Sequence, residues 1–318
     1  MGDETTTVVG AGISGVACAR ALRAAGVPVR VVDRGRRPGG RMGGRTLAGR
    51  PVDLGASYLT ASPGSPFEAV VADWVRRGLA APWTDTFAVA GPDGLERTTT
   101  GPLRFGTPGG LRTLVVDLAR ELDVEQERAV TTVTAGPAVD AEPVGAVVLA
   151  MPDPQAARLL APGAPVARAL DPGSWQPALA VALGWPARQW PADLHGAFVH
   201  DHPVLEWVAD DGDRRGDGAP VLVAHTTAAF AARHLDDPGA AGPQVAGAVR
   251  RMLGIAEEPA WTHVHRWSHA RPTAPREAPF ALDGGIGLCG DGWSAPSKVE
   301  GAWRSGDALG SALAAALR

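Results

Sequence analysis

Three glycines near the amino terminus, Gly10, Gly12 and Gly15, have the spacing that brings a backbone close to a phosphate. Gly10 permits a tight turn, Gly12 leaves room for a pyrophosphate, and Gly15 lets a helix pack closely on a strand. Asp33 ends the next apolar segment, at the distance where a carboxylate accepts hydrogen bonds from a ribose 2′-hydroxyl. This order of strand, glycine turn, helix and acid predicts a dinucleotide site rather than an idle turn.

A second glycine turn, at residues 36–41, follows this acid with the sequence RRPGGR. It resembles the R-x-x-G-G-R stretch of FAD proteins of the amine oxidase and glutathione reductase-like class. Gly39 and Gly40 let the backbone pass close to a cofactor, and Arg41 is a permanent cation for its phosphates. A solvated arginine-rich turn is the alternative, which the spacing from Asp33 disfavours.

The carboxy-terminal stretch supplies a second candidate for the same site. Gly290 and Asp291 follow an apolar strand, and a helix is expected to start near Lys298 or Val299. Amides at a helix start carry partial positive charge and stabilise negative charge on the pyrimidine edge of a reduced flavin. Lys298 either adds a full charge at that edge or is a surface residue, and the sequence leaves both interpretations open.

Composition excludes several classes of protein. The 318 residues include 30 basic and 34 acidic side chains, so no charge excess indicates a nucleic acid or membrane partner. Cys18 and Cys289 are expected to be buried and reduced, which favours the cytoplasm. No leader, long apolar run or metal-ligand spacing is visible, so we expect a soluble protein without a metal. The oligomeric state stays open.

The change of pattern along the chain predicts an α/β fold with two domains. A Rossmann-type FAD-binding domain is expected over residues 1–75, 106–158 and 270–318. A substrate domain with an antiparallel sheet and helices is expected over residues 76–105 and 159–269. Within it, Asp210–Gly218 has six charges and three glycines in nine residues, which predicts a solvent-exposed connection rather than a site.

Several longer stretches are similar to one family, the renalase-like FAD enzymes of bacteria. They are GAGISG at residues 10–15, PGGRM at 38–42, DLGASYLT at 53–60, MPDPQ at 151–155, VHRWSHARP at 264–272 and GDGWSAPSKVEGAWRSG at 290–306. The resemblance spans nearly the whole chain and implies a p-hydroxybenzoate hydroxylase-like fold with non-covalent FAD. It also implies oxidation of 2- and 6-dihydro isomers of NAD(P) to NAD(P)⁺, with oxygen as acceptor and hydrogen peroxide as product.

The resemblance and the motifs together nominate the site residues. The expected FAD-binding residues are Gly10, Gly12, Ile13, Ser14, Gly15, Asp33, Arg34, Gly40, Arg41, Met42, Gly55, Ala56, Ser57, Val130, Gly290, Asp291, Lys298, Val299, Glu300 and Ala302. The residues expected to line the substrate cavity are Tyr58, His265, Trp267 and Trp293. Two departures lie close to the expected flavin edge: bacterial relatives typically have arginine at Lys298, and residues 292–296 are rearranged.

The expected chemistry needs no obligate base, because hydride loss from a dihydropyridine leaves an aromatic pyridinium. We therefore interpret His265 as a positioning residue rather than a base. A flavin amine oxidase is the nearest alternative, although one tyrosine and one lysine in the whole chain do not provide the usual tyrosine cage and lysine. A flavin reductase or monooxygenase lacks support from a second dinucleotide motif. A non-catalytic flavoprotein is a further alternative, but a tryptophan-rich substrate domain would have little purpose in such a protein.

Overall fold

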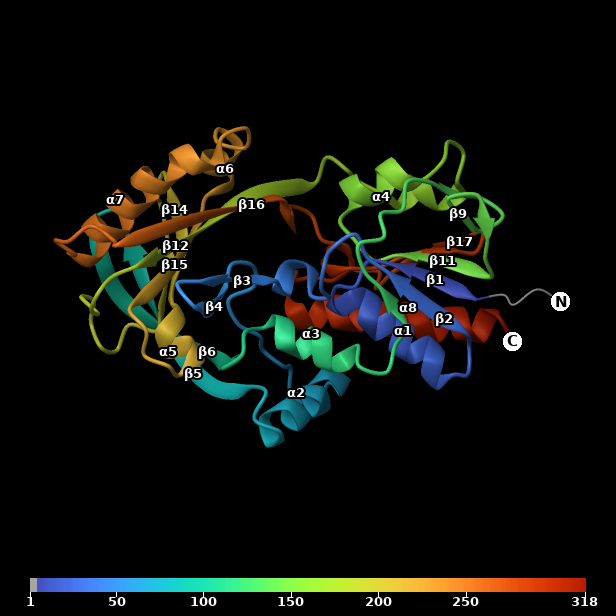
Figure 1. Ribbon diagram of the computed structural model, residues 1–318, viewed down its shortest axis with the longest axis horizontal. Coiled ribbons are helices and arrows are strands. Elements are labelled where there is room, and N and C mark those ends of the chain that lie inside the picture. Colours follow the sequence, from blue (N-terminus) through green and yellow to red (C-terminus); the bar gives the residue numbers. More distant parts are fainter. Residues whose placement is uncertain (1–4) are drawn as a thin grey trace. The chain divides into compact units, whose positions relative to one another are not determined.

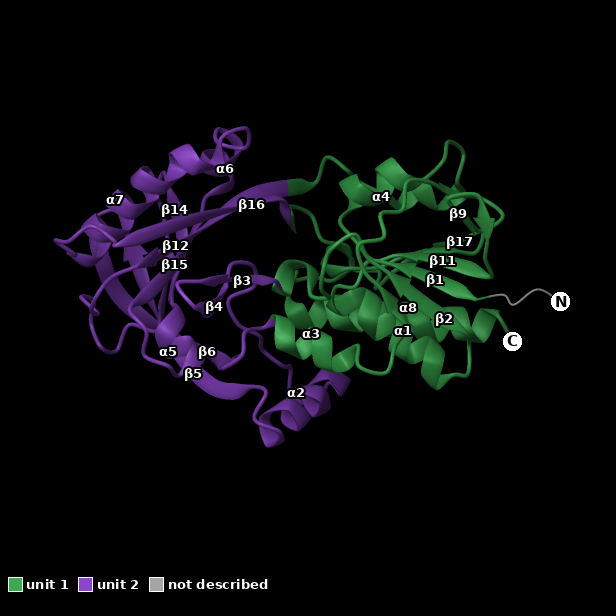
Figure 2. Cartoon of the chain, viewed as in Figure 1, with its two compact units in different colours: residues 1–42, 112–175, 271–318 green, residues 43–111, 176–270 purple. Residues whose placement is uncertain are grey.

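The computed structural model describes residues 5–318, and contacts divide the chain into two compact units (Figure 2). Among the described residues, unit 1 comprises residues 5–42, 112–175 and 271–318, and unit 2 comprises residues 43–111 and 176–270. Both the expected FAD-binding domain and unit 1 are assembled from three separate stretches of the chain. Their boundaries nevertheless differ at several segments.

The differences follow from where side chains are buried. Residues 43–75, expected in the FAD-binding domain, belong to unit 2, because Val52 and Leu54 pack with Ala180 and Val223 of its sheet. Residues 106–111 also belong to unit 2. Residues 159–175, expected in the substrate domain, belong to unit 1, where Val166 lies in the core. The two units are defined by contacts alone, and the division into an FAD-binding and a substrate domain stays a prediction.

Unit 1 is built on a six-stranded sheet in the order β17-β18-β11-β1-β2-β7. Its neighbouring strands are parallel except for the antiparallel pair of β17 and β18. The strands are β1 (Thr6–Val9), β2 (Val29–Val32), β7 (Val124–Glu125), β11 (Ala146–Leu149), β17 (Ala281–Asp283) and β18 (Ile286–Leu288). All four residues of β11 are buried, as expected for a central parallel strand covered on both faces.

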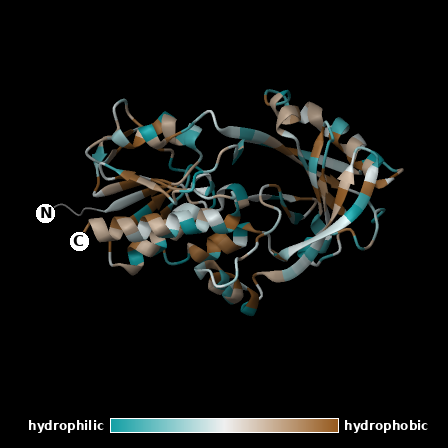
Figure 3. Ribbon diagram, turned by 180° about the vertical axis from the view of Figure 1, so that it is seen from behind, coloured by the Kyte–Doolittle hydropathy of each residue, from teal (hydrophilic) through white to brown (hydrophobic). Residues whose placement is uncertain are grey.

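The two faces of this sheet bury alternate residues. Val8 and Val148 face one core, with residues of α1 (Ile13–Ala24) and α8 (Val299–Ala316), whereas Val9 and Val147 face the other. Figure 1 shows α1 and α8 along one face of the sheet, and Figure 3 shows the hydrophobic colouring of its strands. The remaining elements of unit 1 are η1 (Gly40–Met42), α3 (Arg112–Leu118), β8 (Val133–Thr134), β9 (Ala138–Val139), β10 (Glu142–Pro143), α4 (Asp153–Leu159), η2 (Pro165–Ala169) and η4 (Asp291–Trp293).

Close helix packing brings the two ends of the chain together in unit 1. A Cβ atom at Gly306 of α8 would overlap the carbonyl oxygen of Ser14 in α1, and one at Gly310 would meet the carbonyl oxygen of Cys18 at 2.5 Å. Only glycine therefore lets these backbones approach so closely. Cys18 and Cys289 are buried and free, as predicted, and burial raises the pKa of the Cys289 thiol to about 12.

Unit 2 is built on a seven-stranded sheet in the order β16-β12-β15-β14-β13-β5-β6. Its core places Val245, Val249 and Met252 of α7 with Leu179 and Val181 of β12. Its elements are β3 (Gly44–Leu47), β4 (Arg50–Asp53), α2 (Pro66–Arg76), β5 (Ala81–Gly91), β6 (Gly94–Gly106), β12 (Trp175–Gly184), β13 (Gly196–Val199), β14 (Leu205–Asp210), α5 (Asp211–Arg215), β15 (Val221–Thr226), α6 (Ala228–Ala232), η3 (Pro238–Ala241), α7 (Gly242–Leu253) and β16 (Trp261–Pro272). In this sheet β12 and β15, β15 and β14, β14 and β13, and β5 and β6 pair antiparallel, whereas β13 and β5 pair parallel.

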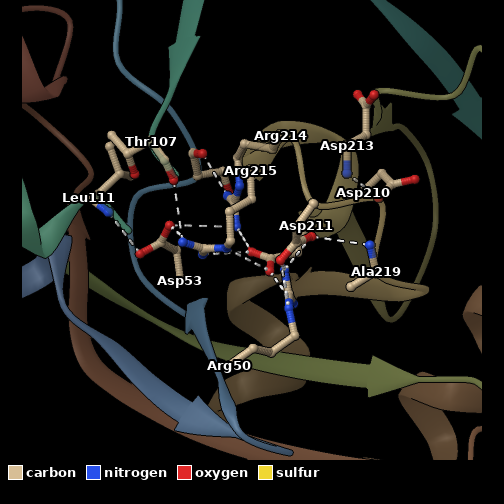
Figure 4. Close-up of polar contacts among 12 residues, drawn as sticks. Arg50, Asp53, Thr107, Leu111, Asp210, Asp211, Asp213, Arg214, Arg215 and Ala219 are labelled. Carbon is tan, nitrogen blue, oxygen red and sulfur yellow. Dashed lines mark hydrogen bonds and ion pairs between the residues drawn. The ribbon is translucent and has the colours of Figure 1, made fainter. Parts of the chain in front are cut away.

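The prediction of an exposed connection at Asp210–Gly218 is wrong. Residues 211–215 form the short helix α5, and Asp211, Arg214 and Arg215 are buried (Figure 4). Arg215 forms a 3.0 Å ion pair with the buried Asp53, and both arginines pair with Asp211. The charges are buried because they neutralise one another, which a count of charges in a window cannot reveal.

Two classes of feature are missing from the part of the chain that the structure describes. No helix over residues 5–318 is long and apolar enough to cross a membrane. The same residues contain no group of three or more histidine, cysteine or acidic side chains that could hold a metal ion.

Candidate functional site

The first glycine turn has the geometry that its sequence predicts. Gly10 has φ of +113°, and a Cβ atom there would lie 2.6 Å from the carbonyl oxygen of Ala150. A Cβ atom at Gly15 would overlap the carbonyl oxygen of Gly10, so Gly15 permits the close packing of α1. A Cβ atom at Gly12 would meet nothing nearer than the Cα of Gly40, at 4.0 Å. The apoprotein thus needs Gly10 and Gly15, while the side of Gly12 stays open.

Asp33 lies at the carboxyl end of β2 and organises this turn. One carboxylate oxygen accepts a hydrogen bond from the Ala11 amide at 2.6 Å, and the other accepts one from the Gly35 amide at 2.6 Å. Each carboxylate oxygen has a second lone pair, so these bonds leave capacity for a ribose hydroxyl. The structure therefore adds a second role, that of holding the glycine turn, to the one expected for Asp33.

Replacing Asp33 by alanine is expected to weaken FAD retention by about 1.5–3 kcal/mol, the worth of a hydrogen bond to a charged group. Fluorescence titration of the apoprotein with FAD measures the change. Because Asp33 also holds the turn, circular dichroism of the variant must confirm an unchanged fold. Unaltered FAD affinity in a folded variant would remove Asp33 from the cofactor site.

An ion pair joins the amino- and carboxy-terminal stretches that the sequence assigns to one site. Arg41 in η1 donates to both carboxylate oxygens of Asp291, at 2.9 and 2.5 Å, across 250 positions of sequence. Ser297 donates to the same carboxylate at 2.8 Å, and the Arg41 guanidinium lies 5.2 Å from the centre of the Trp175 ring. Such two-point pairs fix orientation as well as distance. The two stretches are therefore neighbours within unit 1.

The turn that carries Asp291 leads toward an uncapped helix. Gly290 has φ of +149°, and its amide donates to Ser305 Oγ at 3.0 Å. Lys298 is the exposed N-cap residue of α8 and makes no side-chain capping hydrogen bond. Glu300 is buried in the first turn, where a negative charge is favourable.

The donors of unit 1 fit a dinucleotide. Gly12 is the N-cap of α1 and has no side chain to cap it, so the first amides of this helix are available for an anion. Arg41 supplies a fixed cation and α8 a second uncapped helix start. An FAD molecule, with an anionic pyrophosphate and an isoalloxazine that gains negative charge on reduction, matches these groups.

The other expected FAD-binding residues lie in both units. Gly55, Ala56 and Ser57 belong to unit 2, and the rest belong to unit 1. In unit 1, Arg34 is exposed; the remaining residues are buried or partly buried: Ile13, Ser14, Met42, Val130, Val299 and Ala302.

Three side chains hold the segment that contains Gly55, Ala56 and Ser57. Trp267 Nε1 donates to the carbonyl oxygen of Leu54 at 2.7 Å, and Trp207 Nε1 donates to Ser57 Oγ at 3.0 Å. Arg214 donates to the carbonyl oxygen of Ser57 at 2.6 Å. Sequence reasoning missed Arg214 because it lies within the segment interpreted as an exposed connection.

Tyr58 lies in an aromatic cluster of unit 2, which we define as Tyr58, Trp83, Phe87, Phe198 and Trp207. The ring centres of Tyr58 and Phe87 are 5.4 Å apart, and those of Phe87 and Trp207 are 4.7 Å apart. Tyr58 is partly exposed, whereas Phe87 is fully buried. The cluster thus combines packing with an accessible phenol.

Strand β16, at the edge of the same sheet, carries His265 and Trp267. Their rings meet edge to face, with centres 4.5 Å apart, and His263 lies two residues earlier on the same face. Burial lowers the pKa of His265 to about 4, with further lowering by Arg45 and His263. The imidazole is therefore neutral at physiological pH.

Trp293, the fourth expected cavity residue, is buried in unit 1 and packs in its core. The guanidinium of Arg276 lies 4.2 Å from the centre of the Trp293 ring and pairs with the buried Asp153. The Arg276 amide also donates to the carbonyl oxygen of Gly292 at 2.9 Å. Arg276 thus supports the turn next to Asp291, a role that sequence reasoning missed because no motif marks it.

Comparison with known protein families finds two matches. Residues 8–74 match an NAD(P)-binding Rossmann-like domain. Residues 86–308 match a flavin-containing amine oxidoreductase. The second match extends over most of the chain and into both units.

Solved structures show the same fold at low sequence identity. Cyclohexylamine oxidase from Brevibacterium oxydans IH-35A has a TM-score of 0.77 and 14% identity, with 99% of each chain covered. Wild-type putrescine oxidase bound to putrescine has a TM-score of 0.72 and 14% identity, with 98% of each chain covered. At such identities the similarity establishes the fold alone.

Proposed function

Since the chain belongs to the flavin-containing amine oxidoreductase family and is an FAD-dependent oxidoreductase, we propose that it oxidises 2- and 6-dihydro isomers of NAD(P). The products would be NAD(P)⁺ and hydrogen peroxide. Unit 1 contains most of the expected cofactor residues, and unit 2 contains most of the expected substrate residues. Bound FAD supplies the chemistry of accepting a hydride and passing the electrons to oxygen.

The chain's own residues would bind and orient the cofactor. The uncapped start of α1 and Arg41 would bind the pyrophosphate, and Asp33 would accept hydrogen bonds from the ribose. Amides at the start of α8 would lie toward the flavin edge. Asp291 would orient Arg41 and accept a hydrogen bond from a cofactor hydroxyl.

One observation carries the choice of substrate, namely the charge around the expected substrate residues. The guanidinium of Arg104 lies 5.8 Å from the centre of the Tyr58 ring. The positive charge of Arg45 helps to lower the pKa of His265, whose imidazole is neutral. Such surroundings suit a neutral dihydropyridine ring joined to phosphates. They disfavour a substrate ammonium group, which a cation repels.

Because His265 is neutral down to about pH 4, its substitution by glutamine is expected to change the flavin reduction rate less than about tenfold. The rate should also show no titration near the ordinary histidine pKa between about pH 5 and pH 8. Stopped-flow absorbance with a dihydro isomer measures both. A flavin reduction rate that falls about 100-fold in the variant would make His265 a catalytic base, provided that the wild-type rate depends on pH and the variant rate does not.

The test of function is anaerobic mixing of the FAD-loaded protein with 6-dihydro-NAD, 2-dihydro-NAD, ordinary NADH and a panel of primary amines. We expect flavin bleaching that is fastest with the dihydro isomers. Rapid bleaching by an amine alone would overturn the proposed substrate.

Amine oxidation is the second candidate function, and the aromatic cluster favours it. Its tryptophan and phenylalanine rings provide faces on which a substrate cation can lie. Arg104 opposes this assignment, because its guanidinium already lies 4.0 Å from the centre of the Phe87 ring. The amine panel separates the two functions.

A further inference from the structure

Unit 2 contains three buried arginines, and their charges are balanced differently. Arg214 and Arg215 are 4% and 5% exposed, and both form ion pairs with Asp53 and Asp211. Arg104 is equally buried, at 5% exposure, but no carboxylate of residues 5–318 lies within 4 Å of its guanidinium. A buried charge without a counter-charge is costly, so this cation marks a place where an anion is favourable.

The guanidinium of Arg104 lies against two rings of the aromatic cluster, those of Phe87 and Tyr58. Its guanidinium lies 4.0 Å from the centre of the Phe87 ring and 5.8 Å from that of Tyr58. Nη1 donates to the carbonyl oxygen of Asp85, while the buried Nε has no hydrogen-bond partner among the described residues. The ring faces and one carbonyl stabilise the cation without neutralising it.

The hydroxyl of Tyr58 is the polar group through which the cluster can meet a ligand. A guanidinium is only a donor and cannot accept the phenol proton of Tyr58, so the neighbouring Arg104 leaves that proton to be donated to a ligand. The two indole N–H groups of the cluster are already used, by Trp83 toward Asp213 at 2.6 Å and by Trp207 toward Ser57 at 3.0 Å. Burial raises the pKa of Tyr58, although Arg104 opposes this, so the phenol keeps its proton near neutral pH.

We propose that Arg104 and Tyr58 form a subsite for a negatively charged oxygen of the substrate, a carboxylate or phosphate oxygen. Tyr58 donates its proton to that oxygen, and the neighbouring Arg104 stabilises the negative charge of the oxygen electrostatically. Arg104 is thus a specificity-determining residue that favours anions over ammonium compounds. This inference rests on the proposed function only in taking Tyr58 as part of the substrate cavity.

The first test uses the fact that Tyr58 is the only tyrosine in the chain. The near-ultraviolet alkaline titration of the holoprotein, taken as the difference from the Tyr58→Phe holoprotein, reports this one phenol. We expect Arg104→Met to raise the pKa of Tyr58, because a nearby positive charge is lost. Arg97→Met, on the same strand but exposed, is the control and should leave it unchanged. An unchanged pKa in Arg104→Met would contradict the coupling.

The second test compares benzoate with benzylamine, which have similar rings and opposite charges. Binding is followed by the change that each probe makes in the flavin spectrum. We expect Tyr58→Phe and Arg104→Met each to weaken benzoate binding by about tenfold or more, without weakening benzylamine binding. Equal benzoate affinity in the wild type and in both variants would overturn the proposal, as would wild-type protein that prefers benzylamine.

Further variants and substrates separate the subsite from effects on folding and from the proposed function. If Arg104→Met does not fold, Arg104→Lys can replace it, because lysine keeps the positive charge but loses the planar set of donors. Tyr58→Phe alone still tests the hydrogen bond that Tyr58 donates to the ligand oxygen. Failure of dihydro isomers to reduce the flavin, with benzoate still dependent on both residues, would overturn the proposed function and support the subsite. Dihydro isomers that reduce wild type, Tyr58→Phe and Arg104→Met with equal apparent affinity would support the function and overturn the subsite.

Discussion

Replacement of Asp211 by asparagine is expected to lower the free energy of unfolding by about 3–5 kcal/mol. Asp211 is fully buried and pairs with three arginines, Arg50, Arg214 and Arg215 (Figure 4). Burial alone would raise its pKa, but these arginines hold it below the ordinary value, so the carboxylate is ionised. Asparagine preserves the shape and removes the charge, which leaves two buried guanidinium groups with Asp53 alone.

Urea unfolding followed by tryptophan fluorescence measures this cost. Asp217→Asn is the matched control, because Asp217 pairs with the same Arg50 but its side chain is 41% exposed. Exposed pairs contribute about 0–1 kcal/mol, so the control should remain close to wild type. Similar small costs in both variants would show that the buried network contributes little to stability.

The same network shows where reasoning from sequence ends. Asp53 and Arg215 are distant in the sequence, yet a 3.0 Å ion pair joins them. Their pairing depends on how β4 and α5 pack, and no local pattern records that. A window rich in charge and glycine usually lies in solvent, and here only the distant partner makes burial favourable.

The nucleotide motif was predictable because its requirements are local. The positive φ of Gly10 and the close contact at Gly15 arise within one turn and two adjoining elements. The motifs near both ends of the chain predicted one shared site, and the pairing of Arg41 with Asp291 brings those two stretches together. Arg104 carries no motif, and its importance depends on the lack of a carboxylate beside its guanidinium among residues 5–318, which the sequence does not record.

The glycines of the first turn should separate folding from cofactor binding. Gly15→Ala is expected to destabilise the apoprotein by about 1–3 kcal/mol or more, because its Cβ atom would overlap the carbonyl oxygen of Gly10. Gly12→Ala should leave the apoprotein stable. Gly12 has φ of −76° and ψ of 174°, which alanine adopts readily, and its Cβ atom would meet only the Cα of Gly40 at 4.0 Å.

Although Gly12→Ala should leave the apoprotein stable, we expect this substitution to weaken the binding of FAD. A methyl group there would occupy the open side of the turn, where the pyrophosphate is expected, and a misfit of about 1–3 kcal/mol weakens binding by roughly 10- to 100-fold. Urea unfolding of the apoproteins and fluorescence titration with FAD measure the two effects separately. If Gly12→Ala binds FAD as tightly as the wild type, the cofactor does not approach this turn, and the role assigned to the amides of α1 fails. If Gly12→Ala is instead as unstable as Gly15→Ala, the turn has no open side and its glycines serve the fold alone.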